Sequence, residues 1–238
     1  RSVIGHHVVF DASLPRITEA LRLFGELKKR GLTPDVITYS ALISACEKAG
    51  HWQTAARVFE AMQNDGLEPN VVAYNALISA YEKGGQWQRA LDVFVTKMVP
   101  LGPSPDVITY SALISACGKA KQWKKAFALF ADMKRRHVEP NVYTYNALIS
   151  TCEKGGQWQK ALQLFHELTR RGLTPSTITF GALISACAKA GQWQKAFALF
   201  DHSQRRCVGV KADIITYSAL ISACEKGGQW EKALELFD

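Results

Sequence analysis

One phrase of about thirteen residues recurs along the chain at a nearly fixed interval. It reads TYSALISACEKAG at 38–50 and TYSALISACEKGG at 216–228. Copies with a few substitutions begin at Tyr74, Tyr110, Tyr145 and Phe180. Such an interval of 35–37 residues is the signature of a helical repeat array, in which each unit covers the apolar face of its neighbour. The chain is therefore expected to form one solenoid and not a sheet-based fold.

The interval divides residues 1–238 into seven repeats of a single solenoid domain. Their expected ranges are 1–35, 36–70, 71–106, 107–141, 142–176, 177–213 and 214–238. The first is degenerate, because only its second half aligns with the others, and the last is incomplete. Since the chain begins with Arg1 instead of Met and stops inside a helical pattern, we expect a piece of a longer protein.

Each repeat carries the pattern of two helices. In the last repeat, apolar residues at i, i+3, i+4 and i+7 form one stripe, at Tyr217, Leu220, Ile221 and Cys224. The pair Gly227–Gly228 ends this helix, and a second stripe begins at Trp230. Turns containing proline, such as 33–35, lead to the next repeat. The predicted fold is all-α, a right-handed superhelix of helical hairpins.

Composition limits the classes of function. The 238 residues are 47% hydrophobic, with a formal net charge of +8. This is a globular composition without a membrane-spanning run, and its basic charge suits an anionic partner. Five of the six cysteines occupy the same place in the repeated phrase, at Cys46, Cys117, Cys152, Cys187 and Cys224. We interpret them as small core residues and not as disulfides or zinc ligands, because no C-x-x-C pair is present.

A second group of residues follows the opposite face of each first helix. We number places from the first residue of each repeat. Places 4, 7, 8 and 11 form the core stripe, whereas places 2, 5, 9, 12 and 13 lie within an arc of about 100° on the other side. Place 13 is always lysine, at Lys48, Lys83, Lys119, Lys154, Lys189 and Lys226. We expect stacking to align these lysines in a row of positive charge, with Ser40 and Lys48 facing away from the core.

Six tryptophans begin the second helices, from Trp52 to Trp230. They share a stripe with phenylalanine, so we assign them to the core and not to base stacking. The six histidines show no metal or triad spacing, and we expect no catalytic residue, metal or cofactor.

The repeats resemble the pentatricopeptide repeat family over essentially the whole chain. The resemblance rests on V-x-T-Y-[NS]-A-L-I at the start of the repeat, the lysine near the end of the first helix, A-[LF]-x-L-F in the second helix and the closing P-[DN]. The tetratricopeptide repeat has a similar period but lacks the closing Asp or Asn. The resemblance implies a binder of single-stranded RNA in mitochondria or plastids, reading one base per repeat. It also implies a protein that is not itself an enzyme.

In that family, place 5 and the closing residue select the base. The pairs carried over are Ser40 with Asn70, Asn75 with Asp106, Ser111 with Asn141, and Asn146 with Ser176; Ser218 is the place-5 residue of the last repeat. They imply 5′-A-U-A-C-3′ over residues 36–176. Base-flanking residues are expected at place 2, namely Ile37, Val72, Ile108, Tyr143, Ile178 and Ile215. The place-13 lysines are expected to bind phosphates.

Some residues depart from the family pattern. Gly5 and Gly181 occupy place 5, so we expect their repeats to read poorly. Repeats 71–106 and 177–213 contain one and two extra residues, which are expected to disturb the register.

The leading interpretation is a sequence-selective RNA binder of organellar RNA processing, stability or translation. Two alternatives stay open. One is a structural subunit of an organellar ribosome or membrane complex that contacts other proteins without inserting into the membrane. The other is the targeting arm of a larger RNA-processing enzyme.

Overall fold

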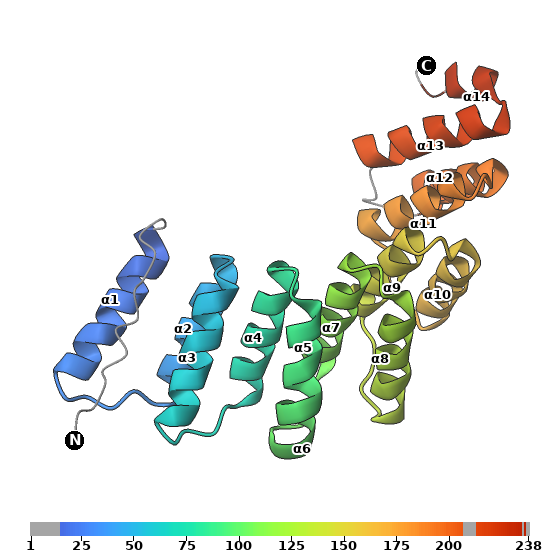
Figure 1. Cartoon of the computed structure of the whole chain (residues 1–238). Coiled ribbons are helices and arrows are strands. Elements are labelled where there is room, and N and C mark those ends of the chain that lie inside the picture. Colours follow the sequence, from blue (N-terminus) through green and yellow to red (C-terminus); the bar gives the residue numbers. More distant parts are fainter. Residues whose placement is uncertain (1–14, 207–212, 235, 237–238) are drawn as a thin grey trace. The chain divides into compact units, whose positions relative to one another are not determined.

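The computed structural model describes residues 15–206, 213–234 and 236, and within these ranges the regular structure is helical (Figure 1). The chain divides into two compact units, Arg1–Ser104 and Pro105–Asp238. Each is a stack of helical hairpins, which confirms the predicted architecture. None of the described helices has the length and hydropathy of a membrane span.

The N-terminal unit begins with one described helix that has no described hairpin partner. Its helices are α1 (Pro15–Lys29), α2 (Val36–Lys48), α3 (Trp52–Asn64), α4 (Val71–Lys83), α5 (Trp87–Val93), η1 (Phe94–Met98) and α6 (Val99–Leu101). The first helices α2 and α4 pack on each other, and α3 packs against both. The second helix α3 therefore joins repeat 36–70 to repeat 71–106.

The C-terminal unit repeats this arrangement. Its helices are α7 (Val107–Lys119), α8 (Trp123–Arg135), α9 (Val142–Lys154), α10 (Trp158–Arg170), α11 (Thr177–Lys189), α12 (Trp193–Arg206), α13 (Ile214–Gly227) and α14 (Trp230–Leu234). The first helices form a continuous layer in which α7 contacts α9, α9 contacts α11, and α11 contacts α13.

The closing residue of each repeat is the N-cap of the next first helix. Its side chain accepts a hydrogen bond from the backbone N–H of place 3, as Asp35 does from Thr38 at 2.8 Å and Asp213 from Thr216 at 2.9 Å. Asp, Asn and Ser are the residues that best satisfy this otherwise unpaired donor. The residue type at the closing place is thus restricted by helix capping as well as by any ligand.

The predicted core stripe is confirmed in the complete repeats. Tyr39, Ile43 and Cys46 are fully buried, and Leu42 is nearly so. All five place-11 cysteines are buried and free, and burial raises the pKa of the Cys46 thiol to about 11. The last repeat differs, because Tyr217 is 38% exposed. Its second helix α14 has only five residues and covers less of α13.

Polar contacts also fix the first helices on the second helices. The Tyr145 hydroxyl donates to Glu167 of α10 at 3.0 Å, and Lys134 contacts the same carboxylate at 2.7 Å. Burial opposes the charge on Glu167, but the hydrogen bonds from Lys134 and Tyr145 outweigh it and lower the pKa of the carboxyl group. Repeats 107–141 and 142–176 are therefore linked by a charge as well as by apolar contact.

The tryptophans differ from the prediction. Those of the complete repeats are half-buried, and Trp230 is 67% exposed. In the C-terminal unit, a lysine of the following repeat lies over the ring: Lys160 over Trp123 at 4.2 Å and Lys195 over Trp158 at 4.0 Å. They are thus inter-repeat cation–π contacts at the edge of the core, a role that the shared stripe with phenylalanine did not indicate.

The extra residue of repeat 71–106 is accommodated inside its second helix. Phe94–Met98 is a π-helix, with the N–H of Val99 donating to the carbonyl of Phe94. A π-turn holds one residue more than an α-turn. Pro100 follows after Val99, and since its ring would clash with the carbonyl of Thr96 in an α-helix, the wider turn also relieves that contact. The second insertion, at 207–212, lies outside the described residues.

Candidate nucleic-acid interface

The first helices present places 2, 5, 9, 12 and 13 on one side, which we call the first-helix face. The place-2 side chains are its most exposed apolar groups. Their exposed fractions are 74% for Ile37, 52% for Val72, 57% for Ile108, 76% for Tyr143, 64% for Ile178 and 64% for Ile215. A side chain of this type in each of the six repeats from residue 36 onward offers a regular series of flat or branched apolar contacts.

Two of the predicted selecting pairs are in direct contact. The Ser40 hydroxyl lies 3.1 Å from Oδ1 of Asn70 and 2.7 Å from the carbonyl oxygen of Val36. Nδ2 of Asn146 donates to Oγ of Ser176 at 3.2 Å. The closing residue comes after a complete second helix, about thirty residues later in the chain, so only the folded hairpin brings each pair together.

A third pair is connected through an intermediate residue. Ser111 and Asn141 both contact the hydroxyl of Thr144, with Oγ of Ser111 at 2.8 Å and Oδ1 of Asn141 at 3.1 Å from it. The fourth pair has one member in each unit. Asn75 belongs to the N-terminal unit, and Asp106 caps α7 by accepting from the N–H of Thr109 at 2.9 Å.

Place 5 is less exposed than the helical pattern predicted. Ser40 is 4% exposed, and Asn75 and Asn146 are each 8% exposed, whereas Ser218 is exposed. The prediction treated each helix alone. Within the described stacks, the place-5 side chain of Ser40 or Asn146 lies against the start of the next first helix. These side chains therefore lie at the bottom of the first-helix face and not on its surface.

Some of the place-13 lysines form ion pairs with glutamates, so the row is not uniformly positive. Lys83 forms an ion pair with Glu47 at 2.5 Å, and Lys189 forms one with Glu153. In each case the glutamate is at place 12 of the preceding repeat, with a side chain only 16% exposed. Phosphate binding by the six lysines stays a prediction, and two of them already have a carboxylate partner.

Other lysines of the row lack such a partner. Among the described residues, Lys48, Lys154 and Lys226 have no carboxylate within ion-pair distance. For Lys154 and Lys226 the reason lies in the preceding repeat, where place 12 is Gly118 or Ala188 and not glutamate. The identity of place 12 therefore decides whether the next lysine has an ion-pair partner.

A steric conflict explains why place 12 of α7 is glycine, at Gly118. A Cβ at this residue would lie 2.1 Å from Oγ1 of Thr151, the place-10 residue of the next repeat. The other repeats from residue 36 onward have alanine at place 10. Thr151 is fully buried, and its hydroxyl donates to the carbonyl of Ala147 at 2.6 Å. The larger side chain at place 10 thus excludes one at place 12 of the preceding helix.

A hollow of about 350 Å³ opens on the first-helix face between α11 and α13. It is lined by Ser185, Ala188, Lys189, Ile214, Ile215, Ser218, Ala219 and Ser222. These are small polar and apolar residues with one lysine at the edge. Three of these residues, Ser185, Ala188 and Lys189, belong to the repeat in which Gly181 occupies place 5, and Lys189 is the lysine that is paired with Glu153.

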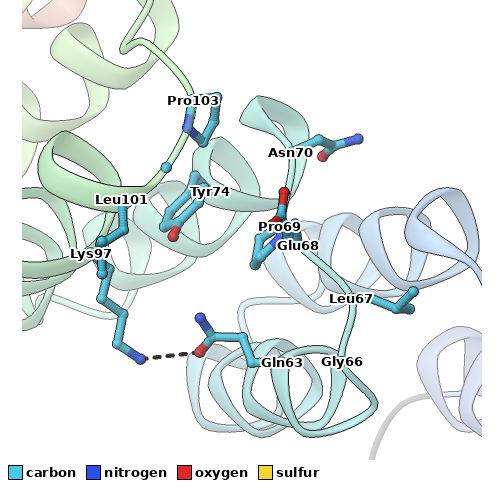
Figure 2. Close-up of a pocket in the computed structure, with 11 residues that line it drawn as sticks. Gln63, Gly66, Leu67, Glu68, Pro69, Asn70, Tyr74, Lys97, Leu101 and Pro103 are labelled. Carbon is cyan, nitrogen blue, oxygen red and sulfur yellow. Dashed lines mark hydrogen bonds between the residues drawn. The ribbon is translucent and has the colours of Figure 1, made fainter.

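A larger hollow of about 790 Å³ lies beside the π-helix of the N-terminal unit (Figure 2). Its wall includes Tyr74 and Asn70, and Lys97 of η1 donates to Gln63 of α3 at 3.2 Å across one side. Leu101 at the rim is 86% exposed. The sequence did not predict this hollow.

The described residues hold no group of three or more His, Cys, Asp or Glu side chains placed to bind a metal. The first-helix face contains amides, hydroxyls, lysines, place-12 glutamates and apolar side chains. Such groups bind by hydrogen bonding, stacking and charge.

Family models match most of the chain. The model described as PPR repeat family matches residues 69–119, 105–154, 144–189 and 175–226. The pentatricopeptide repeat domain matches 22–84, and the PPR repeat matches 215–238. A search of curated proteins found no match.

Solved structures share the fold. The pentatricopeptide repeat protein PPR10 in complex with an 18-nt psaJ RNA element is 27% identical, with a TM-score of 0.79, over 93% of this chain and 32% of that one. PPR10 from maize is matched at 27% identity and a TM-score of 0.56, over 92% of this chain and 36% of that one. This chain thus spans about a third of the length of PPR10.

The PPR domain of Arabidopsis thaliana protein-only RNase P 1, in complex with tRNA, is 16% identical with a TM-score of 0.63, over 77% of this chain and 95% of that one. At this identity the likeness concerns the fold alone. The family matches, by contrast, extend over residues 22–238 and coincide with the repeated phrase. The chain belongs to the pentatricopeptide repeat family.

Proposed function

We propose that the first-helix face binds single-stranded RNA at about one base per repeat, and that the protein acts in RNA metabolism of a mitochondrion or plastid. The observation that carries the proposal is the contact between place 5 and the closing residue, at 3.1 Å for Ser40 with Asn70 and 3.2 Å for Asn146 with Ser176. Two polar side chains at one point, beside an exposed place-2 residue, form a unit that can read one base edge.

The likeness to PPR10, solved with an RNA element, supports the ligand class. The bases follow from the family resemblance: adenine for Ser40 with Asn70, uracil for Asn75 with Asp106, adenine for Ser111 with Asn141, and cytosine for Asn146 with Ser176. This order of bases assumes the repeat boundaries 36–70, 71–106, 107–141 and 142–176. In this proposal the repeat array recognises the RNA, and other proteins carry out any chemistry on it.

Phosphate binding is assigned chiefly to Lys48, Lys154 and Lys226, because Lys83 and Lys189 are already paired with glutamates. Single-stranded binders combine a basic track with apolar or aromatic contacts to the bases. The place-2 side chains supply the second element here, with Tyr143 as the one aromatic among them.

The second candidate function is that of a structural subunit that binds other proteins. The ion pairs of Lys83 and Lys189 favour it, since they consume charge that an RNA-binding face would use. A targeting arm of an RNA-processing enzyme would use the same face as the leading proposal.

Recoding of one repeat tests the proposal. Ser111→Asn creates the combination of Asn with Asn141, which the family associates with cytosine. Binding of A-U-A-C and A-U-C-C RNAs, differing only at the third base, is measured for both proteins. We expect a shift from adenine toward cytosine worth about 1–3 kcal/mol, the scale of one specific base contact.

Ser44→Asn is the matched control, because it makes the same change on the same face at place 9 instead of place 5. It should leave the base preference unchanged. If Ser111→Asn loses affinity for both RNAs equally, the result contradicts base reading and favours the protein-binding scaffold. A wild type that binds both RNAs with equal affinity leads to the same conclusion.

A further inference from the structure

In three repeats the hydroxyl of the place-4 tyrosine donates to a carboxylate on the second helix. The pairs are Tyr39 with Asp65 at 2.5 Å, Tyr110 with Asp132 at 2.5 Å, and Tyr145 with Glu167 at 3.0 Å. A lysine of the preceding repeat binds the same carboxylate in two of them, Lys28 with Asp65 at 2.8 Å and Lys134 with Glu167 at 2.7 Å. A carboxylate between a tyrosine and a lysine is thus a recurring part of the junction between repeats.

Repeat 71–106 lacks this carboxylate. Asp132 and Glu167 stand nine residues before the closing residue of their repeats, where repeat 71–106 has Lys97. Asp65 stands five residues before the closing residue of its repeat, where repeat 71–106 has Leu101. One carboxylate place is therefore taken by an ammonium group, and the other by an apolar side chain that is 86% exposed.

The place-4 tyrosine of this repeat, Tyr74, has a hydroxyl without a hydrogen-bond partner among the described residues, although the residue is only 3% exposed. Burial alone raises the pKa of Tyr74, whereas at Tyr110 the neighbouring carboxylate contributes as well. Tyr74 lines the hollow of about 790 Å³ beside the π-helix, and Figure 2 shows its hydroxyl directed into this space. Since buried polar groups are normally hydrogen bonded, the hydroxyl marks a place for a ligand group.

Two further donors face the same hollow. Lys97 donates to Oε1 of Gln63 at 3.2 Å, and because an ammonium group only donates, the oxygen of this amide must face Lys97. The amide nitrogen then points toward the hydroxyl of Tyr74 (Figure 2). Among the described residues Lys97 has no ion-pair partner, and Glu68, the one acidic residue of the described lining, is exposed and forms no ion pair. The hollow therefore combines three donors with an unneutralised positive charge.

A carboxylate fits this arrangement best, because a carboxylate occupies the space between tyrosine and lysine at the equivalent junctions. Several donors are needed to offset the hydration that a carboxylate loses on burial, and an ammonium, a hydroxyl and an amide supply them here. Leu67, Leu101 and Pro103 also line the hollow and offer apolar contacts beside the donors. The lining thus suits an acidic side chain that is followed or preceded by an apolar one.

We propose that the hollow beside η1 binds an aspartate or glutamate side chain of a protein partner, with Tyr74, Lys97 and Gln63 as its donors. The partner supplies the carboxylate that the equivalent junctions supply from their own second helices. Leu101 contacts the neighbouring apolar residue of the partner. The site goes beyond the proposed RNA binding, because its three donors lie outside places 2, 5, 9, 12 and 13 of the first-helix face.

The experiment titrates the chain with N-acetyl-Leu-Asp-amide, N-acetyl-Leu-Asn-amide and inorganic phosphate. Binding is followed by the NMR shifts of the backbone amides of Gly66 and Gly102, which line the hollow. We expect the aspartyl peptide to bind at least about tenfold more tightly than the asparaginyl peptide, the scale of one hydrogen bond to a charged group. Phosphate should bind more weakly than the aspartyl peptide.

Three variants identify the donors. Tyr74→Phe and Lys97→Met should each lower the affinity for the aspartyl peptide about tenfold. Lys134→Met is the matched control, because it makes the same change at a junction that holds its own Glu167, and it should leave the affinity unchanged. Urea unfolding of Tyr74→Phe should match the wild type, since its hydroxyl has no partner to lose among the described residues.

A fourth variant restores the internal carboxylate. Leu101→Asp places an acid where repeat 36–70 has Asp65, and it should lower the affinity for the aspartyl peptide about tenfold. Leu101→Asn removes the same apolar side chain without adding charge, so it should lower the affinity less. Equal losses in these two variants would show that the hollow does not select a negative charge.

The proposal is overturned if neither peptide binds, or if both bind with equal affinity. It is also overturned if Tyr74→Phe and Lys97→Met bind the aspartyl peptide as tightly as the wild type does. Tighter binding of inorganic phosphate than of the aspartyl peptide would replace the acidic protein segment by a phosphate group as the ligand.

Discussion

The junction between α9 and α11 and the junction between α11 and α13 share one scaffold but differ in the groups they expose. At the first, Asn146, Ser176 and Thr179 are hydrogen bonded together, and Glu153 is paired with Lys189. At the second, place 5 is Gly181, place 12 is Ala188, and Lys226 has no carboxylate partner among the described residues. The core residues are alike in both, including Leu148 and Leu183 at place 7, which are fully buried.

This contrast separates two kinds of information in one repeat. Places 4, 7, 8 and 11 determine the stack, whereas places 5 and 12 determine what the stack presents. A change at place 5 or 12 therefore alters the first-helix face without altering the fold, provided that the next repeat leaves room for it. Gly118 is the case in which it does not, because of Thr151.

The largest expected effect tests this steric limit. Gly118→Ala places a Cβ 2.1 Å from Oγ1 of Thr151 and should lower the free energy of unfolding by about 1–3 kcal/mol, the cost of overpacking a full site. Urea unfolding of Gly118→Ala, Thr151→Ala and the double variant forms a double-mutant cycle. The double variant should be more stable than Gly118→Ala alone; purely additive losses would disprove the conflict.

A smaller effect is expected from converting the second junction toward the first. Gly181→Asn adds an amide where a Cβ would lie 3.7 Å from Oγ1 of Thr216, an ordinary contact. With Asp213 as the closing residue, the family resemblance implies uracil. RNAs of the form A-U-A-C-N, compared at their last base, should then show a preference for uracil of about tenfold, the scale of one base contact.

Gly181→Ala is the control for this change, because it adds the Cβ without the amide and should bind all four RNAs alike. If Gly181→Asn also binds them alike, place 5 does not carry base selection at this junction.

The smallest effect concerns the ion pair. Glu153→Gln keeps the acceptor for Ser185, whose hydroxyl lies 3.0 Å away, but releases Lys189. RNA affinity at low salt should rise by about threefold. The slope of log affinity against log salt should become steeper by about 0.7, the value of one added phosphate contact to a single strand.

Glu225→Gln makes the same charge change at place 12 of α13, where no lysine partner exists among the described residues. It should affect affinity less than Glu153→Gln and leave the slope almost unchanged. Identical slopes for the two variants would show that the pairing of Lys189 does not limit phosphate binding.

Much of the fold follows from the sequence, because helical periodicity depends on one helix at a time. The burial of Tyr39, Ile43 and Cys46 is of this kind. The covered position of Asn146 and the pairing of Glu153 with Lys189 depend on the distance between successive first helices, which the pattern of a single helix does not contain. The contact of Thr179 with Asn146 was missed for the same reason, although threonine at place 3 in most repeats was a visible signal.

The π-helix shows a different limit. The count of 36 residues in repeat 71–106 indicated an insertion, and we expected it to disturb the register of the repeats. The structure accommodates the residue in a π-helix at Phe94–Met98, shortly before Pro100, and the effect on the register stays a prediction. Only the local backbone shows which turn widens, since the sequence of an insertion does not specify where the additional residue is accommodated.

The most direct test of the central claim is a structure of the chain with an RNA that contains A-U-A-C. The account predicts that the strand lies along the first-helix face. The cytosine should lie against Asn146 and Ser176 beside Tyr143, with the Asn146 amide within hydrogen-bond distance of the base and a phosphate near Lys154. RNA bound to the second helices, or bases turned away from Asn146 and Ser176, would contradict it.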